Sequence, residues 1–180
     1  MERLSIKTGS LKFVLGWLLI VLIRLIPFRP PNFQPMMATM MPFSKRYSVV
    51  SIFLFGFFTM VVVDFFMSNL GVWTLFTATV FGFLGVWSYF YFQKRLGKVK
   101  NYVKFSIYGT LFYDIVTGLS IGPLFFNQPL WSAITGQIVF TLWHLAGNIV
   151  FAIILSPLIE KWLVSNETLE ISLFKEKKYI

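Results

Sequence analysis

Long apolar runs separated by short polar stretches dominate the chain. Five runs have this character: Phe13–Phe28, Tyr47–Met67, Val72–Phe92, Phe105–Ile121 and Leu130–Ile159. A helix of about 20 residues crosses the roughly 30 Å hydrocarbon core of a bilayer, and most of these runs are near that length. The pattern therefore predicts at least five transmembrane helices.

A sixth apolar segment, Asn32–Phe43, is short and bounded by prolines. Positive charge decides how it is interpreted, because cytoplasmic loops of membrane proteins are enriched in Lys and Arg. If the segment crosses and the N-terminus is inside, the clusters at 45–46 and 94–104 fall inside together with both ends of the chain. Only Arg24, within the first helix, and Arg29, outside, then depart from the rule. This favours six spans.

The predicted fold is all-α: an integral membrane bundle of six transmembrane helices with cytoplasmic N- and C-termini. Residues 1–180 form a single polytopic domain in a cell inner (plasma) membrane, and the lipid bilayer is its first partner. The expected helices cover approximately 11–28, 32–44, 47–67, 72–92, 103–121 and 131–157. Residues 160–180 mix both charges and are expected to form a tail at the cytoplasmic surface.

Composition supports a membrane protein and excludes several other classes. Charged residues make up 13% of the chain, whereas a soluble domain has about 25%. The net charge of +9 lies in clusters between apolar runs, which indicates membrane topology and no nucleic-acid partner. The sequence has no Cys, one His and no phosphate-binding Gly-Lys-Ser/Thr loop, so we expect no catalytic residues, no metal site and no cofactor.

Three charges lie inside predicted helices, where each costs several kcal/mol and therefore needs a partner, a cavity or a function. In the six-span topology Arg24, Asp64 and Asp114 all fall in the outer half of the membrane. Gln137, Thr141, His144 and Asn148 are spaced to share one face of the last helix, and Trp73 begins the fourth. Together these residues predict an outward-opening polar and aromatic pocket between the last three helices.

Each of these residues also has a purely structural interpretation. Arg24 could tie helices through Asp64 or Asp114, and His144 and Asn148 could hydrogen-bond to a neighbouring helix. Trp73 also fits the aromatic belt at a membrane surface. The glycines are most simply positions of close packing: Gly82, Gly85, Gly118 and Gly122.

Short motifs along residues 11–160 resemble the substrate-binding S components of energy-coupling factor (ECF) transporters. In the first half of the chain they are Arg24-Leu25-Ile26-Pro27, Pro30-Pro31-Asn32-Phe33-Gln34-Pro35, Asp64, Gly71-Val72-Trp73-Thr74 and Gly82-Phe83-Leu84-Gly85. In the second half they are Tyr113-Asp114, His144 and Gly147-Asn148.

The resemblance implies capture of a vitamin or another small-molecule micronutrient, followed by uptake through a transmembrane coupling protein and two ATPase subunits. It implies that Asn32 closes over the substrate, that Trp73 stacks on it, and that Arg24 and Asp64 orient polar groups or brace the loop. The remaining implied ligand contacts are hydrogen bonds between the ligand and Asp114, Gln137, His144 and Asn148. Arg24 would suit an acidic group, and the aromatic residues a ring.

One departure concerns docking of the coupling protein, because the first helix has Gly16 followed by bulky Trp17 and Leu18 and shows no small-xxx-small pair. Three alternatives therefore stay open. The chain could be a non-transporting structural protein of the cell-shape machinery, or a standalone small-solute carrier. An intramembrane hydrolase using Asp64, Asp114 and His144 is the third, although their spacing does not favour it.

Overall fold

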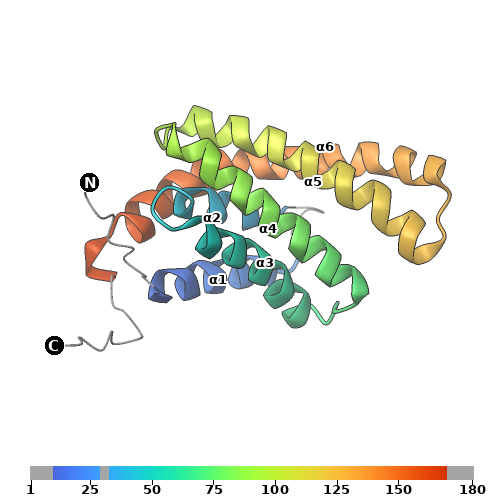
Figure 1. Ribbon diagram of the computed structural model, residues 1–180, viewed down its shortest axis with the longest axis horizontal. Helices are drawn as coiled ribbons and strands as arrows, with labels where there is room; N and C mark the ends of the chain where they lie inside the picture. Colours follow the sequence, from blue (N-terminus) through green and yellow to red (C-terminus); the bar gives the residue numbers. More distant parts are fainter. Residues whose placement is uncertain (1–9, 29–32, 170–180) are drawn as a thin grey trace.

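Every regular element is a helix in the residues that the computed structural model describes, which are 10–28 and 33–169 (Figure 1). The helices are α1 (Ser10–Arg24), α2 (Met36–Phe43), α3 (Val49–Phe66), α4 (Val72–Gln93), α5 (Val99–Phe126) and α6 (Leu130–Ile159). A π-helical turn (Glu160–Val164) continues α6, and a single 3₁₀ turn follows at Glu167–Leu169. The predicted all-α fold is confirmed for this part of the chain.

Four helical segments are long and apolar enough to cross a membrane: Val49–Phe66, Val72–Gln93, Val99–Phe126 and Leu130–Val164. The protein is therefore a membrane protein. Helix α1 has 15 residues and ends at Arg24, earlier than expected. Helix α2 has eight residues, which at about 1.5 Å per residue is roughly 12 Å and too short to cross the hydrocarbon as a helix.

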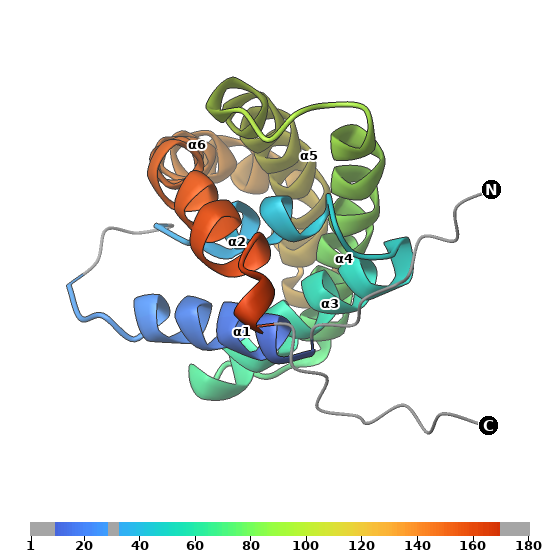
Figure 2. The ribbon, with the colours of Figure 1, turned by 90° about the vertical axis from the view of Figure 1, so that its left-hand side faces the viewer.

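The short α2 is the centre of the bundle. All eight of its residues are buried, and the view along the bundle shows it enclosed by the other helices (Figure 2). Met37, Met40 and Met41 are almost fully buried there, where flexible thioether side chains can fill irregular gaps between helices. Helix α2 therefore forms part of the hydrophobic core of the bundle.

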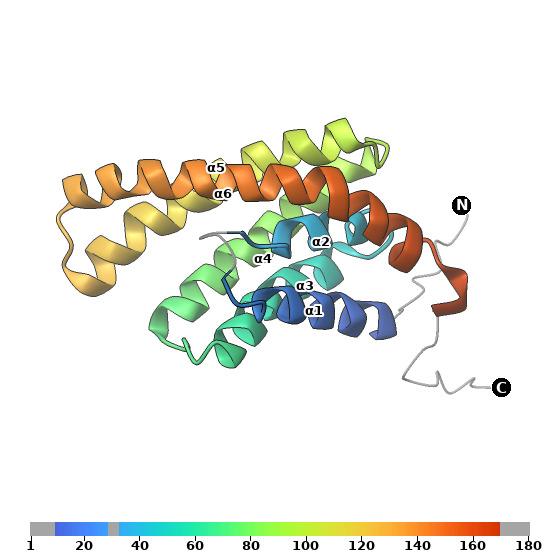
Figure 3. The ribbon, with the colours of Figure 1, turned by 180° about the vertical axis from the view of Figure 1, so that it is seen from behind.

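Helix α5 extends well beyond the predicted range at both ends. It begins at Val99, after extended Lys98, and continues through Pro123 to Asn127, whose backbone is left-handed with φ 51°. Pro123 lies in the last turn of the helix, and Asn tolerates the left-handed conformation at a helix end. Helices α5 and α6 consequently form a long hairpin that projects past the α3–α4 turn (Figures 1 and 3).

Glycines allow α3 and α4 to approach each other closely. A Cβ atom on Gly56 would lie 2.7 Å from the carbonyl oxygen of Phe81, and one on Gly85 would lie 2.7 Å from that of Ile52. Gly82 faces the Phe53 ring in the same interface. Backbone atoms cannot move aside as a flexible side chain can, so these positions favour glycine, in agreement with the packing interpretation of Gly82 and Gly85.

Polar contacts close the end of the bundle at which α2, α4 and α6 finish. The Glu160 carboxylate accepts hydrogen bonds from Lys45 Nζ and from the Tyr102 hydroxyl. Lys12 Nζ, which is buried, donates to the carbonyl oxygen of Val164 at 3.0 Å. These contacts and the burial of Val164 hold the first residues of the predicted tail, 160–164, against the bundle, while the Lys161 and Trp162 side chains are exposed. Residues 170–180 of that tail lie outside the described part.

A polar cavity at the opposite end of the bundle

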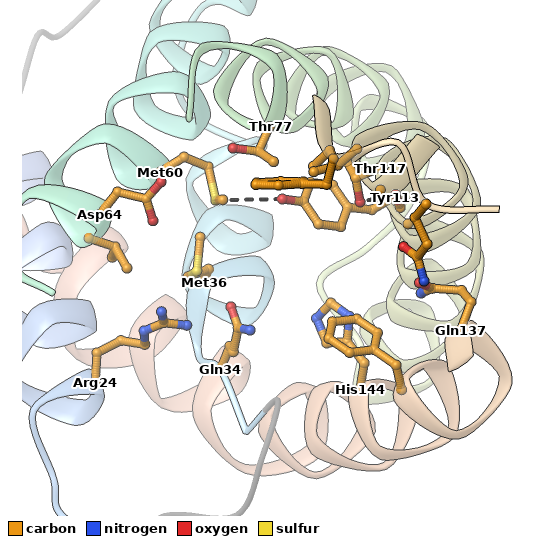
Figure 4. A pocket seen from close by; sticks show the side chains of 17 residues that line it. Arg24, Gln34, Met36, Met60, Asp64, Thr77, Tyr113, Thr117, Gln137 and His144 are labelled. Atoms are coloured by element: carbon orange, nitrogen blue, oxygen red, sulfur yellow. Dashed lines mark hydrogen bonds between the residues drawn. The ribbon is translucent and has the colours of Figure 1, made fainter. Parts of the chain in front are cut away.

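A cavity of about 440 Å³ lies at the end opposite to Glu160, and every helix or its flanking segment contributes to the cavity wall (Figure 4). One polar residue from each is Arg24 at the end of α1, Gln34 before α2, Asp64 in α3, Thr77 in α4, Thr117 in α5 and His144 in α6. The chain thus reaches the cavity at the end of α1 and α3 and near the start of α2 and α4. Successive helices run in opposite directions between the cavity and the Glu160 end.

Arg24 and Asp64 lie on one side of the cavity (Figure 4). Asp64 Oδ2 accepts a hydrogen bond of 2.7 Å from Thr74 Oγ1, and the same hydroxyl oxygen accepts one of 3.1 Å from the Gly71 amide at the start of α4. Asp64 is largely buried. The carboxylate therefore joins the end of α3 to the beginning of α4 and also presents negative charge to the cavity.

His144 and Asp114 form a buried pair on the other side. The Nδ1 atom of His144 lies 2.7 Å from Asp114 Oδ1, and Asp114 is fully buried. Asp114 Oδ2 has no hydrogen-bond partner among the described residues. Since Nδ1 is used by Asp114, Nε2 is the ring nitrogen of His144 that remains available to a ligand in the cavity.

One turn along α6 and α5, the amide of Asn148 donates a hydrogen bond of 2.8 Å to Thr110 Oγ1. Both residues are buried. Asn148 also borders a much smaller chamber beside the main cavity, which shares Gln34, Met36, Tyr113 and His144 with it. The polar face of α6 therefore meets the polar face of α5 in two successive pairs.

Two glutamine side chains occupy space that glycines of α5 leave open. Cβ atoms on Gly118 and Gly122 would collide with the side-chain oxygens of Gln137 and Gln128, respectively. Both glutamines line the cavity. Gly118 and Gly122 are therefore close-packing positions, in agreement with the prediction, and the groups packed against them are polar side chains of the cavity wall.

Aromatic rings and thioethers complete the cavity wall. Tyr113, Phe126 and Phe140 line it together with Met36 and Met60. The Tyr113 hydroxyl points at Met60 Sδ, 3.9 Å away (Figure 4). A site with mostly apolar walls and a few oriented polar groups is the usual form of a small-molecule pocket, and its volume is within the range of about 300–1,000 Å³ for such sites.

The predicted site residues fall into five groups in the structure. Arg24, Asp64, Gln137 and His144 line the cavity. Asp114 does not line it but supports His144 from behind, and Asn148 borders only the smaller chamber. Trp73 is absent from the wall and packs on Phe126, with ring centroids 5.4 Å apart. Asn32 lies outside the described residues.

Sequence reasoning missed several residues of the wall: Gln34, Met36, Met60, Phe126, Gln128 and Phe140. The pairing of each glutamine with a glycine on α5 was not readable from spacing, because it depends on how far the α5–α6 hairpin extends. The methionines carry no sequence signal of their own in an apolar chain.

The described residues contain no cluster of three or more His, Asp or Glu side chains that could hold a metal ion. The cavity instead offers separate hydrogen-bonding and charged groups around an aromatic interior. A search of protein-family models, curated proteins and solved structures finds no significant match to this chain.

Proposed function

We propose that the protein is a membrane-embedded subunit that captures a small-molecule micronutrient for uptake. The observation that carries this proposal is the cavity itself, to which all six helical segments bring polar or charged groups. Such groups are costly inside a membrane, and a bound solute that hydrogen-bonds to them would offset part of that cost. Capture needs no catalytic residue, so we propose no enzymatic reaction.

Charge distribution supports an outward-facing cavity. The basic loops at 45–46 and 94–98 lie at the Glu160 end, where Lys45 meets Glu160, and the positive-inside rule assigns that end to the cytoplasm. Alternating helix directions then give six passes with both termini inside. We propose that α2 makes its pass together with the non-helical residues beside it, shielded from lipid by the surrounding helices.

Energy for uptake would come from other proteins. The sequence has no phosphate-binding loop for ATP, and its motifs resemble ECF S components, which work with a transmembrane coupling protein and two ATPase subunits. We propose the same kind of partners here. Because α1 has no small-xxx-small pair, its Gly16 offers no standard docking face; a Cβ there would contact the Phe43 and Phe55 rings.

Co-purification tests the proposal. The protein is purified in a mild detergent and extracted with solvent, and small molecules in the extract are identified by mass spectrometry. We expect one stoichiometric solute from the wild type. Gln137→Ala, which removes a polar group from the wall, should retain it about tenfold less tightly.

Ile138→Ala is the matched control, because Ile138 is the next residue on α6 and is 59% exposed on the bundle surface. It should retain the solute like the wild type. If no solute is found with the wild type, or if Gln137→Ala and Ile138→Ala retain it equally, solute capture at this cavity is excluded.

A structural role in cell-shape machinery is the second candidate, and one observation favours it. Asp64–Thr74, Asp114–His144 and Asn148–Thr110 all join neighbouring helices, as ties within a scaffold would. Affinity purification separates the two functions: ATPases and a coupling protein support uptake, whereas cell-wall enzymes support the scaffold. Solute transport in liposomes by the protein alone would instead identify a standalone carrier.

A further inference from the structure

The donors and acceptors of the cavity define the class of its ligand. We propose, on the basis of the solute-binding function above, that the ligand is a small organic cation carrying N–H donors. The hydroxyl groups of the wall have already used their own hydrogens within the protein, the glutamines direct carbonyl oxygens at the wall, and two carboxylates lie in or directly behind it.

The hydroxyl groups of the wall act as acceptors toward the cavity. Thr77 Oγ1 donates to the carbonyl oxygen of Thr74 at 3.1 Å, and Thr117 Oγ1 donates to that of Tyr113 at 2.8 Å. The Tyr113 hydroxyl hydrogen points at Met60 Sδ. A hydroxyl has one hydrogen, so all three oxygens can offer only lone pairs to a ligand.

The two glutamines also present acceptor oxygens at the wall. Gln137 Nε2 donates to Thr141 Oγ1 at 3.1 Å, and Gln128 Nε2 donates to Ser132 Oγ at 3.3 Å, each four residues further along the chain. Their Oε1 atoms occupy the space above Gly118 and Gly122 at the cavity wall. Each side chain thus directs its amide nitrogen along α6 and its carbonyl oxygen toward α5.

Two carboxylates and one guanidinium lie in or directly behind the wall. Arg24 and Asp64 line the cavity with opposite formal charges, while Asp114 lies behind the wall and pairs with His144. An imidazole that gives its single N–H to Asp114 is neutral and presents Nε2 as an acceptor. In that tautomer the Asp114 carboxylate keeps its negative charge, which in a poorly polarisable interior is best neutralised by a positive ligand.

The apolar part of the wall also suits a cation. Tyr113, Phe126 and Phe140 present rings to the cavity, and the faces of aromatic rings attract positive charge. An anion would meet carboxylate, carbonyl and hydroxyl oxygens as well as ring faces, with Arg24 and the Gln34 amide as its principal donors. Acceptor groups therefore outnumber donor groups around the ligand.

Matched aromatic probes test the ligand class. Benzamidinium, benzamide and benzoate share one ring and similar size but are positive, neutral and negative, and their binding to the detergent-solubilised full chain is measured by native mass spectrometry. We expect benzamidinium to bind at least about tenfold more tightly than the other two, as for hydrogen bonds to a charged group. Asp114→Asn, which keeps an acceptor for His144, should remove that preference, and Gln137→Glu should increase it.

The charge of the co-purified solute is a second test of the ligand class. A cationic solute, or a benzamidinium preference that Asp114→Asn removes, supports the proposal. A neutral or anionic solute, a benzoate preference, or a cation preference that survives Asp114→Asn overturns the ligand class while leaving solute capture intact. If no solute co-purifies and none of the three probes binds, both the ligand class and solute capture at this cavity are excluded.

Discussion

Replacing His144 by alanine is expected to lower the free energy of unfolding by about 3–5 kcal/mol, the usual effect of leaving a buried charge without its partner. Asp114 is fully buried, and Oδ1 has its hydrogen bond from the His144 ring while Oδ2 has none among the described residues. Without the imidazole, both carboxylate oxygens would lie in the helix bundle without a partner. Thermal unfolding in detergent, followed by the loss of helical circular dichroism, measures the change.

A double variant provides the internal control. His144→Ala with Asp114→Ala leaves neither member of the pair, so no buried carboxylate remains to be solvated. We expect the double variant to be more stable than His144→Ala alone, because removal of both partners avoids the uncompensated charge. Equal or lower stability of the double variant would show that the pair is not a coupled unit.

Replacing Gly118 by valine is expected to weaken solute binding by about 100-fold or more, which corresponds to roughly 2.7 kcal/mol. The new side chain would occupy the position of the Gln137 amide and push that group into the cavity. The polar group of Gln137 at the wall and part of the cavity volume would be lost together. The amount of co-purified solute per mole of protein reports the effect.

Gly136→Val is the matched control for this variant. Gly136 lies beside Gln137 on α6, yet a Cβ atom there meets nothing within 4 Å. It therefore introduces the same side chain next to the same glutamine without entering the cavity, and solute retention should be unchanged. Equal loss in the two variants would indicate a general effect on the helices, and unchanged binding in Gly118→Val would remove Gln137 from the site.

Periodicity predicted the pairing of α5 and α6 well because it is a local property of a helix. The spacing of Gln137, His144 and Asn148 set them on one face, and the structure brings His144 to Asp114 and Asn148 to Thr110. The shared depth of Arg24 and Asp64 also followed from span counting, and both line the cavity. Charge and spacing alone were sufficient to predict that these residues lie near one another.

Contacts that depend on how the helices pack could not be predicted in this way. Helix α2 looked like a thin span, but its burial on all sides arises from the five helices around it. Trp73 was expected in the site from its place at the start of the fourth helix and from the resemblance, whereas in the structure it packs on Phe126 and does not line the cavity. The length of α5 beyond Pro123, which brings Gln128 and Phe126 to the cavity, likewise depends on the hairpin and not on the local sequence.

The orientation of the bundle is the central claim, since an uptake site has to face the exterior. The chain contains no Cys, so single cysteines introduced at the exposed positions Asn69 and Lys98 can be labelled in intact cells with a membrane-impermeant maleimide. The account predicts that Asn69→Cys, at the cavity end, reacts in intact cells and that Lys98→Cys reacts only after the membrane is permeabilised. Labelling of Lys98→Cys but not Asn69→Cys in intact cells would place the cavity on the cytoplasmic side and contradict uptake from outside.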